Sequence, residues 1–219
     1  MNSISKALAV FLAVDLVAAK AVAMEQTPPP GALERTGQKY FYMSGGSFSP
    51  DGNSQLRNPS GQYGLALGFG SRFSPNVAWE IEFLNSLQRV DTPFSVQPAF
   101  LTTTEGRADI DTYGLAGNVR FIYPLGRFEP YLGGGIGFYR TTLEVQQAFL
   151  GFLSSEIEKS DNGVGLQLLA GMEYHFGEKG NSVGLQYRKL KLDASFGPEV
   201  QGKVNVGGDF IFLTFRWSF

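Results

Sequence analysis

Apolar and polar side chains alternate along most of the chain after residue 40. In the segment Asp209–Phe219, DFIFLTFRWSF, the odd-numbered positions from 211 to 219 are large and apolar, whereas the even-numbered ones include Thr214, Arg216 and Ser218. Because successive side chains of a strand point to opposite faces, this segment has one apolar face and one face that carries an arginine. Such a pattern is typical of a strand whose apolar face contacts lipid.

The same alternation predicts eight strands, near residues 40–48, 63–73, 77–87, 108–123, 129–145, 162–176, 182–192 and 203–219. Short connections rich in turn formers lie at 74–76, 124–128 and 177–181, and longer ones at 49–62, 88–107, 146–161 and 193–202. This arrangement predicts an all-β fold, an eight-stranded antiparallel up-and-down transmembrane β-barrel with short periplasmic turns and long extracellular loops. A β-sandwich or a lipocalin would need its apolar residues inside.

The N-terminus has the features of an export signal. Lys6 precedes an apolar run, and Ala21-Val22-Ala23 supplies a small-x-small cleavage motif, so residues 1–23 are predicted to be a signal peptide. Asp15 interrupts the apolar run, which leaves a short amphipathic helix as the alternative. Residues 24–39 contain three consecutive prolines and are predicted to form a Pro-rich periplasmic arm, followed by the barrel at 40–219.

Composition narrows the chemistry. The chain has 219 residues, no cysteine, one histidine and a formal net charge of -2, which fits one domain and excludes disulfides and thiol chemistry. After the N-terminal run, no stretch approaches the roughly 18–20 apolar residues that a transmembrane helix needs. No basic patch indicates a nucleic-acid partner.

Two passages resemble a known superfamily. Asn118–Tyr139, NVRFIYPLGRFEPYLGGGIGFY, and Val164–Phe176, VGLQLLAGMEYHF, are similar to the small outer-membrane β-barrels that include the OmpA-type barrel domain and the opacity and porin-like surface proteins. The resemblance covers about residues 40–219. It implies a monomer in the bacterial outer membrane that contacts lipid and lipopolysaccharide, and a C-terminal strand, ending in Trp217 and Phe219, that the barrel assembly machinery recognises. No peptidoglycan-binding domain is expected.

The predicted inner face carries a network of charges at Arg72, Glu80, Glu82, Arg120, Glu173, Arg188 and Arg216. Side chains nearly fill the interior of an eight-stranded barrel, so we expect these charges to pair across the lumen and close it. A narrow or gated ion path is the alternative, because paired charges can exchange partners. Glycines at 133, 135 and 137 are expected to make room for large groups from neighbouring strands.

Catalysis and metal binding have little support in the sequence. His175 lies beside a short turn with no serine one or two residues away on its strand, so it is expected to be a lumen hydrogen-bonding partner rather than a catalytic base. One histidine without cysteine offers no first-row metal site, and no cofactor is indicated. The chain is therefore predicted not to be an enzyme, with a lipid A-modifying enzyme as the third-ranked function.

The long connections are the predicted carriers of function. Phe94 and Phe100 make one of them unusually apolar, and Phe149 and Phe152 do the same for another. These residues are candidates for contact with a surface or host ligand, although mutual packing or strand extension is the simpler account. The predicted function is a structural or surface-interaction role, adhesin-like, with a narrow channel or a carrier of small or hydrophobic molecules as the alternative.

Aromatic residues near the membrane boundary are predicted to form a lipid-side girdle, at Tyr40, Tyr42, Trp79, Tyr123, Tyr174, Trp217 and Phe219. Lys189 and Lys191 lie near the outer end of the seventh predicted strand. They are expected to meet lipopolysaccharide phosphates or to remain solvated.

Overall fold

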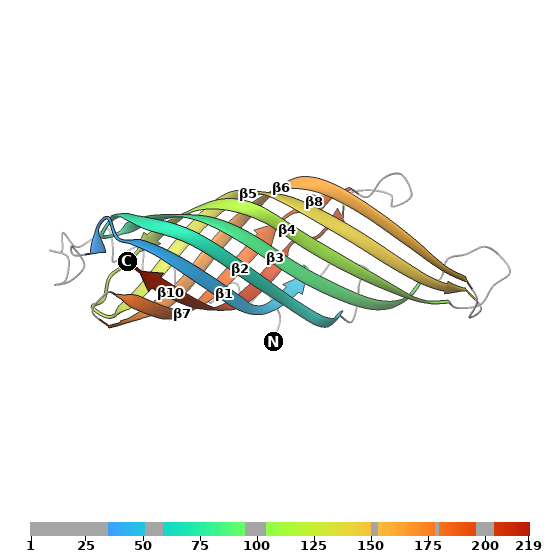
Figure 1. The fold of residues 1–219 in the computed structure, drawn as a ribbon, viewed down its shortest axis with the longest axis horizontal. Coiled ribbons are helices and arrows are strands. Elements are labelled where there is room, and N and C mark those ends of the chain that lie inside the picture. The colour runs from blue at the N-terminus through green and yellow to red at the C-terminus, as the bar shows by residue number, and fades with distance from the viewer. Residues whose placement is uncertain (1–34, 51–58, 95–103, 150–152, 178–179, 196–203) are drawn as a thin grey trace, which may run out of the picture.

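The computed structural model describes residues 35–50, 59–94, 104–149, 153–177, 180–195 and 204–219. These residues form ten strands: β1 (Lys39–Pro50), β2 (Pro59–Ser74), β3 (Val77–Phe94), β4 (Thr104–Ile122), β5 (Phe128–Phe149), β6 (Leu153–Phe176), β7 (Asn181–Lys191), β8 (Asp193–Ala194), β9 (Val204–Asn205) and β10 (Gly208–Ser218). Eight of them close an antiparallel barrel in the order β1-β10-β7-β6-β5-β4-β3-β2, and β8 pairs with β9 (Figure 1). The predicted eight-stranded barrel is confirmed. None of the described residues forms a helix long and apolar enough to cross a membrane.

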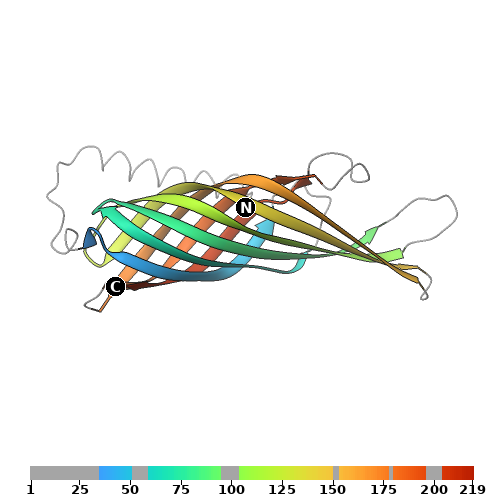
Figure 2. The ribbon, with the colours of Figure 1, turned by 45° about the horizontal axis from the view of Figure 1, so that its top comes forward.

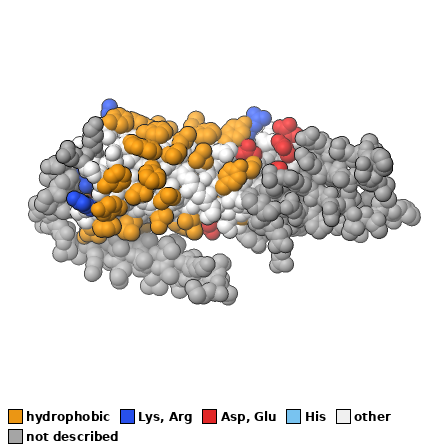
Figure 3. Space-filling model, turned by 60° about the horizontal axis from the view of Figure 1, so that its bottom comes forward, with side chains coloured by type: hydrophobic (Ala, Val, Ile, Leu, Met, Phe, Trp, Pro, Cys, Tyr) orange, Lys and Arg blue, Asp and Glu red, His pale blue; other side chains and the backbone are white. Residues whose placement is uncertain are grey.

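Alternation along each strand sets the two faces of the wall. In β10, Ile211 is 61% exposed whereas the next residue, Phe212, is fully buried. Leu166 and Leu168 of β6 likewise point outward, and Gln167 between them is buried. Large exposed hydrophobic side chains occur on all eight strands of the wall, and Figure 3 shows one face of this hydrophobic belt. Apolar residues therefore cover the outer face, whereas the buried inner face includes many polar and charged residues, the reverse of a water-soluble barrel.

Four neighbouring strands continue well beyond the rest of the wall. β6 has 24 residues, whereas β7 and β10 have 11 each. The ladders of β3 with β4 and of β5 with β6 run to Phe94↔Thr104 and Phe149↔Leu153. The ends of these strands project together from the side of the barrel opposite the short turns (Figures 1 and 2). We call the part of β3–β6 beyond the wall the projecting sheet.

The prediction of loops at 88–107 and 146–161 was therefore wrong over most of their length, and the strand extension considered for these segments is confirmed there. Both segments are largely strand, with only 95–103 and 150–152 between the ends of the paired strands. A strand that leaves the membrane has solvent on both faces, so it loses the apolar-polar alternation that identifies it in the wall.

The last predicted strand also differs. β10 begins at Gly208 rather than at 203, and Val204–Asn205 forms β9, which pairs with β8 through Asp193↔Asn205. Between β9 and β10 the chain turns inward: a Cβ at Gly207 would lie 2.2 Å from the carbonyl oxygen of Leu190, so only glycine fits there. This turn brings Val206 into the interior.

The residues before β1 close against the short-turn end. The Gly37 amide donates to the Arg72 carbonyl at 2.8 Å, and the Arg72 amide donates to the Gln38 carbonyl at 3.0 Å. Gly37 has a φ of +80°, which a residue with a side chain rarely adopts. The predicted signal peptide and residues 24–34 of the predicted arm lie outside the described residues and stay predictions.

Candidate functional site

A closed ring of four charges crosses the lumen nearer the short-turn end. Arg120 of β4 and Arg216 of β10 each contact both Glu80 of β3 and Glu173 of β6. The distances to Glu80 Oε1 are 2.7 Å from Arg120 Nη1 and 2.9 Å from Arg216 Nη2. All four side chains are buried. The ring therefore ties together four strands from different parts of the wall.

A second ion pair lies next to the ring. Arg188 of β7 donates from both terminal nitrogens to Glu82 of β3, each at 2.6 Å, which is the bidentate geometry of a strong pair. Arg188 also donates to Gln186 at 3.0 Å. Both members of the pair are buried.

The mouth at the short-turn end holds a third cluster, around Glu129. This carboxylate accepts from Arg35 and Arg72, and His175 Nε2 lies 2.8 Å from it. The other ring nitrogen of His175 contacts the Gly180 carbonyl at 3.0 Å. Neither ring nitrogen of His175 thus has a hydroxyl as its partner. Among the described residues, no group of three or more His, Asp and Glu side chains is placed to hold a metal ion.

The structure places all seven residues of the predicted charge network inside the barrel, each in contact with an opposite charge. Glu129 was missed. Its signal was present in the sequence, because Glu129 alternates in phase with Tyr131 and Gly133 on the inner face of β5.

Tyr40 and Tyr42 do not belong to the girdle, and that part of the prediction was wrong. Both are buried, and their hydroxyls donate to Glu80 at 3.0 Å and to Glu82 at 2.9 Å. Phe41 occupies the outer face between them and pairs with Trp217 of β10. A tyrosine suits either face of such a wall, because its ring is apolar and its hydroxyl needs a partner.

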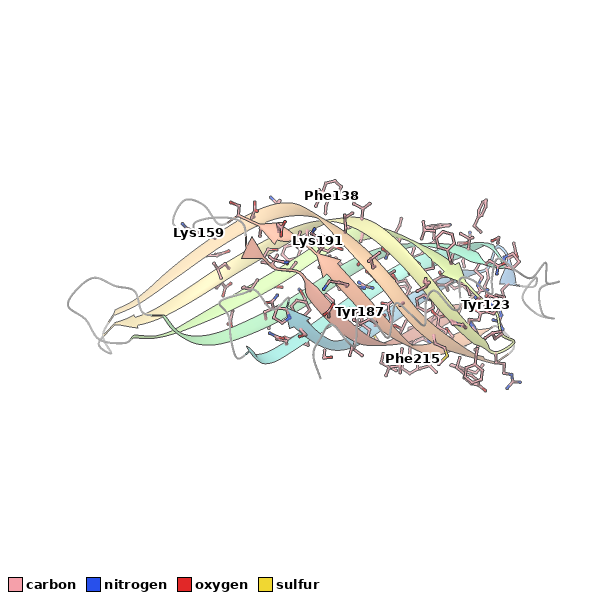
Figure 4. The ribbon with its side chains drawn as sticks, turned by 180° about the vertical axis from the view of Figure 1, so that it is seen from behind. Tyr123, Phe138, Lys159, Tyr187, Lys191 and Phe215 are labelled. Atoms are coloured by element: carbon pink, nitrogen blue, oxygen red, sulfur yellow. The ribbon has the colours of Figure 1, made fainter. Side chains whose placement is uncertain are left out.

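The remaining girdle residues do line the outer surface near the short turns. Trp79, Trp217 and Phe219 are exposed, and Tyr123 and Tyr174 are half-buried. Figure 4 shows Tyr123 at this end of the barrel. Three further exposed tyrosines, not predicted, lie nearer the opposite end, at Tyr63, Tyr113 and Tyr187.

Apolar side chains fill the lumen between the Arg188–Glu82 pair and the projecting sheet. The Phe210 ring lies 4.3 Å from the Phe48 ring and 5.2 Å from the Phe212 ring, measured between centroids. We call this group the apolar plug; its buried members are Phe48, Ala66, Leu84, Ile110, Ala116, Tyr139, Leu190, Leu192, Ala194, Val206, Phe210 and Phe212. β8 contributes Ala194, and the residues that flank the short β8–β9 sheet, Leu192 and Val206, also belong to the plug.

The interior glycines act as expected for close packing. A Cβ at Gly135 would lie 1.9 Å from Asn118 Oδ1 and 2.4 Å from the Gly117 carbonyl oxygen. Gly133 leaves similar space beside Arg120. Large polar groups from β4 therefore occupy the gaps that the glycines of β5 leave.

The four contact candidates are only partly placed. Phe94 and Phe149 are the last residues of β3 and β5 in the projecting sheet, and nothing is described of their side chains. Phe100 and Phe152 lie outside the described residues. Their roles stay predictions.

Figure 3 shows acidic and basic side chains together at one end of the hydrophobic belt. Asp109, Glu144 and Glu158 lie opposite one another on β4, β5 and β6. Lys189 lies 3.3 Å from Asp209, and Lys191 is exposed. Figure 4 shows Lys159 on the projecting part of β6, away from Lys191.

Known proteins share this architecture. Residues 9–219 match the family model described as outer membrane protein beta-barrel domain. The crystal structure of Neisserial surface protein A is similar at 14% identity and a TM-score of 0.52, over 84% of this chain and 98% of the other. OprG from Pseudomonas aeruginosa is similar at 19% identity and a TM-score of 0.45, over 84% of this chain and 97% of the other. Ail, the attachment invasion locus protein of Yersinia pestis, is similar at 17% identity and a TM-score of 0.44, over 83% of this chain and 99% of the other. The sequence matches no curated protein.

Proposed function

The chain belongs to the outer membrane protein β-barrel domain family and is located in the bacterial outer membrane, and we propose that it is a surface-interaction barrel whose projecting sheet contacts an extracellular partner. The barrel serves as the anchor. The proposal assigns no catalytic residue and no cofactor.

The unequal strand lengths carry this proposal. β7 and β10 end after 11 residues, which is close to what a tilted strand needs to cross the hydrocarbon layer, whereas β6 has 24. β3, β4 and β5 are also long, with 18, 19 and 22 residues. The extra length is not needed for spanning, and it holds a paired sheet out toward the medium.

The filled lumen supports the same proposal. Three groups of paired charges occupy the periplasmic half, and the apolar plug follows them toward the extracellular side. An ion would have to separate buried pairs, which costs several kcal/mol per charge left unpaired, and would then have to cross an apolar layer.

A narrow channel is the second candidate, and the charge ring is the observation that favours it. Each carboxylate of the ring is shared by two guanidinium groups, so a rotation at Arg120 or Arg216 exchanges partners without leaving a carboxylate unpaired. Planar-bilayer recording on the purified protein separates the candidates. We expect no stable open state, whereas large, long-lived conductance steps would favour the channel.

The surface role is tested by shortening the β5–β6 hairpin. Leu143, which packs against the apolar plug, lies opposite Lys159, so residues 144–158 can be replaced by an Asn-Gly turn that keeps this contact. Expressed in a non-adherent host strain, the shortened protein should still fold, as judged by its mobility on unheated gels, but should lose adherence to surfaces coated with serum proteins. A matched variant with residues 52–57 of the β1–β2 connection shortened should keep adherence. If the variant with the shortened β5–β6 hairpin adheres as well as the variant with the shortened β1–β2 connection, the projecting sheet is not the contact surface.

A further inference from the structure

Among the described residues, one edge of the projecting sheet is not paired in a ladder with another strand. β6 pairs with β7 only from Leu166 to Phe176, because the chain after β7 leaves this ladder and pairs as β8 with β9. On its other side β6 stays paired with β5 as far as Leu153. The segment Leu153–Gly165 therefore has a ladder on one side only, within the part of the chain that the structure describes.

The chain beside β8 covers part of this edge. The Ser195 amide donates to Asp161 Oδ2 at 2.6 Å, and a Cβ at Gly163 would lie 3.0 Å from a methyl group of Leu192. Leu153–Ser160 lies beyond these contacts. Its length is that of an ordinary strand, about five to eight residues, so the edge is long enough to pair with another one.

The opposite edge of the sheet is much less suited to pairing. β3 is paired with β2 up to Val90, which leaves only Asp91–Phe94 beyond it. This short segment contains Pro93, which has no amide hydrogen to donate. Between residues 153 and 160 β6 has neither proline nor short length as protection; its charged residues, Lys159 among them, are the edge protection it does carry.

A row of carboxylates leads across the sheet to the β6 edge. Asp109 lies opposite Glu144, and Glu144 lies opposite Glu158. Glu144 and Glu158 are both exposed. Like charges directly opposite one another destabilise a sheet. The next position in this row, beyond Glu158, is the one that a side chain of an added strand would occupy.

We propose that a partner protein adds an extended, basic segment to the β6 edge at Leu153–Ser160, with a lysine or arginine opposite Glu158; this inference rests on the surface-interaction function above. Main-chain hydrogen bonds to β6 supply affinity, as in other strand additions. The carboxylate row sets the register, because a cation opposite Glu158 replaces a like-charge contact by an opposite-charge one. A second copy of the chain would bring the same carboxylates to this edge and is disfavoured.

The test uses the full-length protein in nanodiscs and three fluorescent peptides of about eight residues: alternating Lys-Thr, alternating Glu-Thr, and Lys-Thr with every second amide N-methylated on the pairing edge. We expect the unmethylated Lys-Thr peptide to bind. The affinities of the Glu-Thr peptide and of the methylated peptide should be lower by at least about tenfold. Raising the salt concentration should weaken its binding. Hydrogen exchange should slow at residues 153–160 when the peptide is bound.

Two variants identify the position of contact. Glu158→Lys should weaken Lys-Thr binding by at least about tenfold, whereas Asp209→Asn, which alters an acidic residue on β10 instead of the β6 edge, should not change it. Equal binding of the methylated peptide, or unchanged binding to Glu158→Lys, would overturn the strand-addition proposal even if the shortened hairpin abolishes adherence. If adherence survives that shortening, the proposed function fails, whatever the peptides show.

Discussion

Strands β3 to β6 belong both to the eight-stranded barrel wall and to the projecting sheet, and their two parts lie in different environments. In the wall each strand has two neighbours, its outer side chains lie in the hydrophobic belt, and its inner ones pack against paired charges or the apolar plug. In the projecting sheet β6 loses one neighbour and the exposed side chains include Glu144 and Glu158. In the closed wall every strand is paired on both sides, which stabilises it. In the projecting sheet the edge of β6 is not paired in a ladder, so it can pair with another strand.

This contrast predicts that stability depends on the interior of the wall and hardly at all on the projecting sheet. The largest effect is expected for Glu173→Gln. Arg120 and Arg216 would then share Glu80 alone, and breaking a buried ion pair by removing one partner costs about 3–5 kcal/mol. Urea unfolding in lipid vesicles, followed by the mobility shift on unheated gels, measures the loss.

A compensating variant separates charge from shape in this ring. Glu173→Gln combined with Arg216→Gln restores charge balance and should recover part of the lost free energy of unfolding. If the double variant is less stable than Glu173→Gln by the full cost of a second broken pair, the ring does not act as one electrostatic unit.

The next largest effect is expected in the apolar plug. Leu84→Ala removes a fully buried side chain and should lower the free energy of unfolding by about 3 kcal/mol, since the cavity is only partly refilled. Leu115→Ala on the same wall is the control. Leu115 is 59% exposed on the outer face, so acyl chains replace its contacts and the loss should stay below about 1 kcal/mol. Equal losses would mean that the plug is loosely packed.

A smaller effect is expected for Gly135→Ala. The added methyl would overlap Asn118 Oδ1, and overpacking of this kind costs about 1–3 kcal/mol. Gly117→Ala is the matched control on the neighbouring strand, because no atom lies within 4 Å of a Cβ placed there. Stability that falls equally in both variants would point to backbone entropy rather than to packing.

The smallest effect is expected in the projecting sheet. Glu158→Gln removes one of two like charges that lie opposite each other, so the free energy of unfolding should rise by a few tenths of a kcal/mol at low salt. The gain should disappear at high salt, where surface charges are screened. A loss above about 1 kcal/mol would show that Glu158 stabilises the barrel and would weaken the contrast between the two regions.

Much of the wall was predictable because one physical rule governs it. In β10, the residues predicted to face outward are exposed and those predicted to face inward are buried, from Ile211 to Ser218. The charged residues of the lumen were predictable for the same reason. Lipid on the outer side excludes charged residues from that face, so within the membrane they have only the interior.

Other features had no such rule behind them. Tyr40 and Tyr42 are compatible with either face, and only their burial and their hydrogen bonds to Glu80 and Glu82 in the folded barrel show that they point inward. The projecting sheet carries no lipid-facing pattern and was taken for loops. The inward turn at Gly207 depends on a contact with Leu190, which no local pattern indicates.

The sequence by itself thus determined the fold class, the membrane address and which residues of most strands face the lumen, because a strand in contact with lipid needs an apolar residue at every second position. Only the tertiary structure decided which charges meet. Arg216 lies 136 residues from Glu80 in the chain, and their contact depends on the register of every strand between them around the barrel. The open edge of β6 is likewise a tertiary result, because it exists only where β7 ends before its neighbour does.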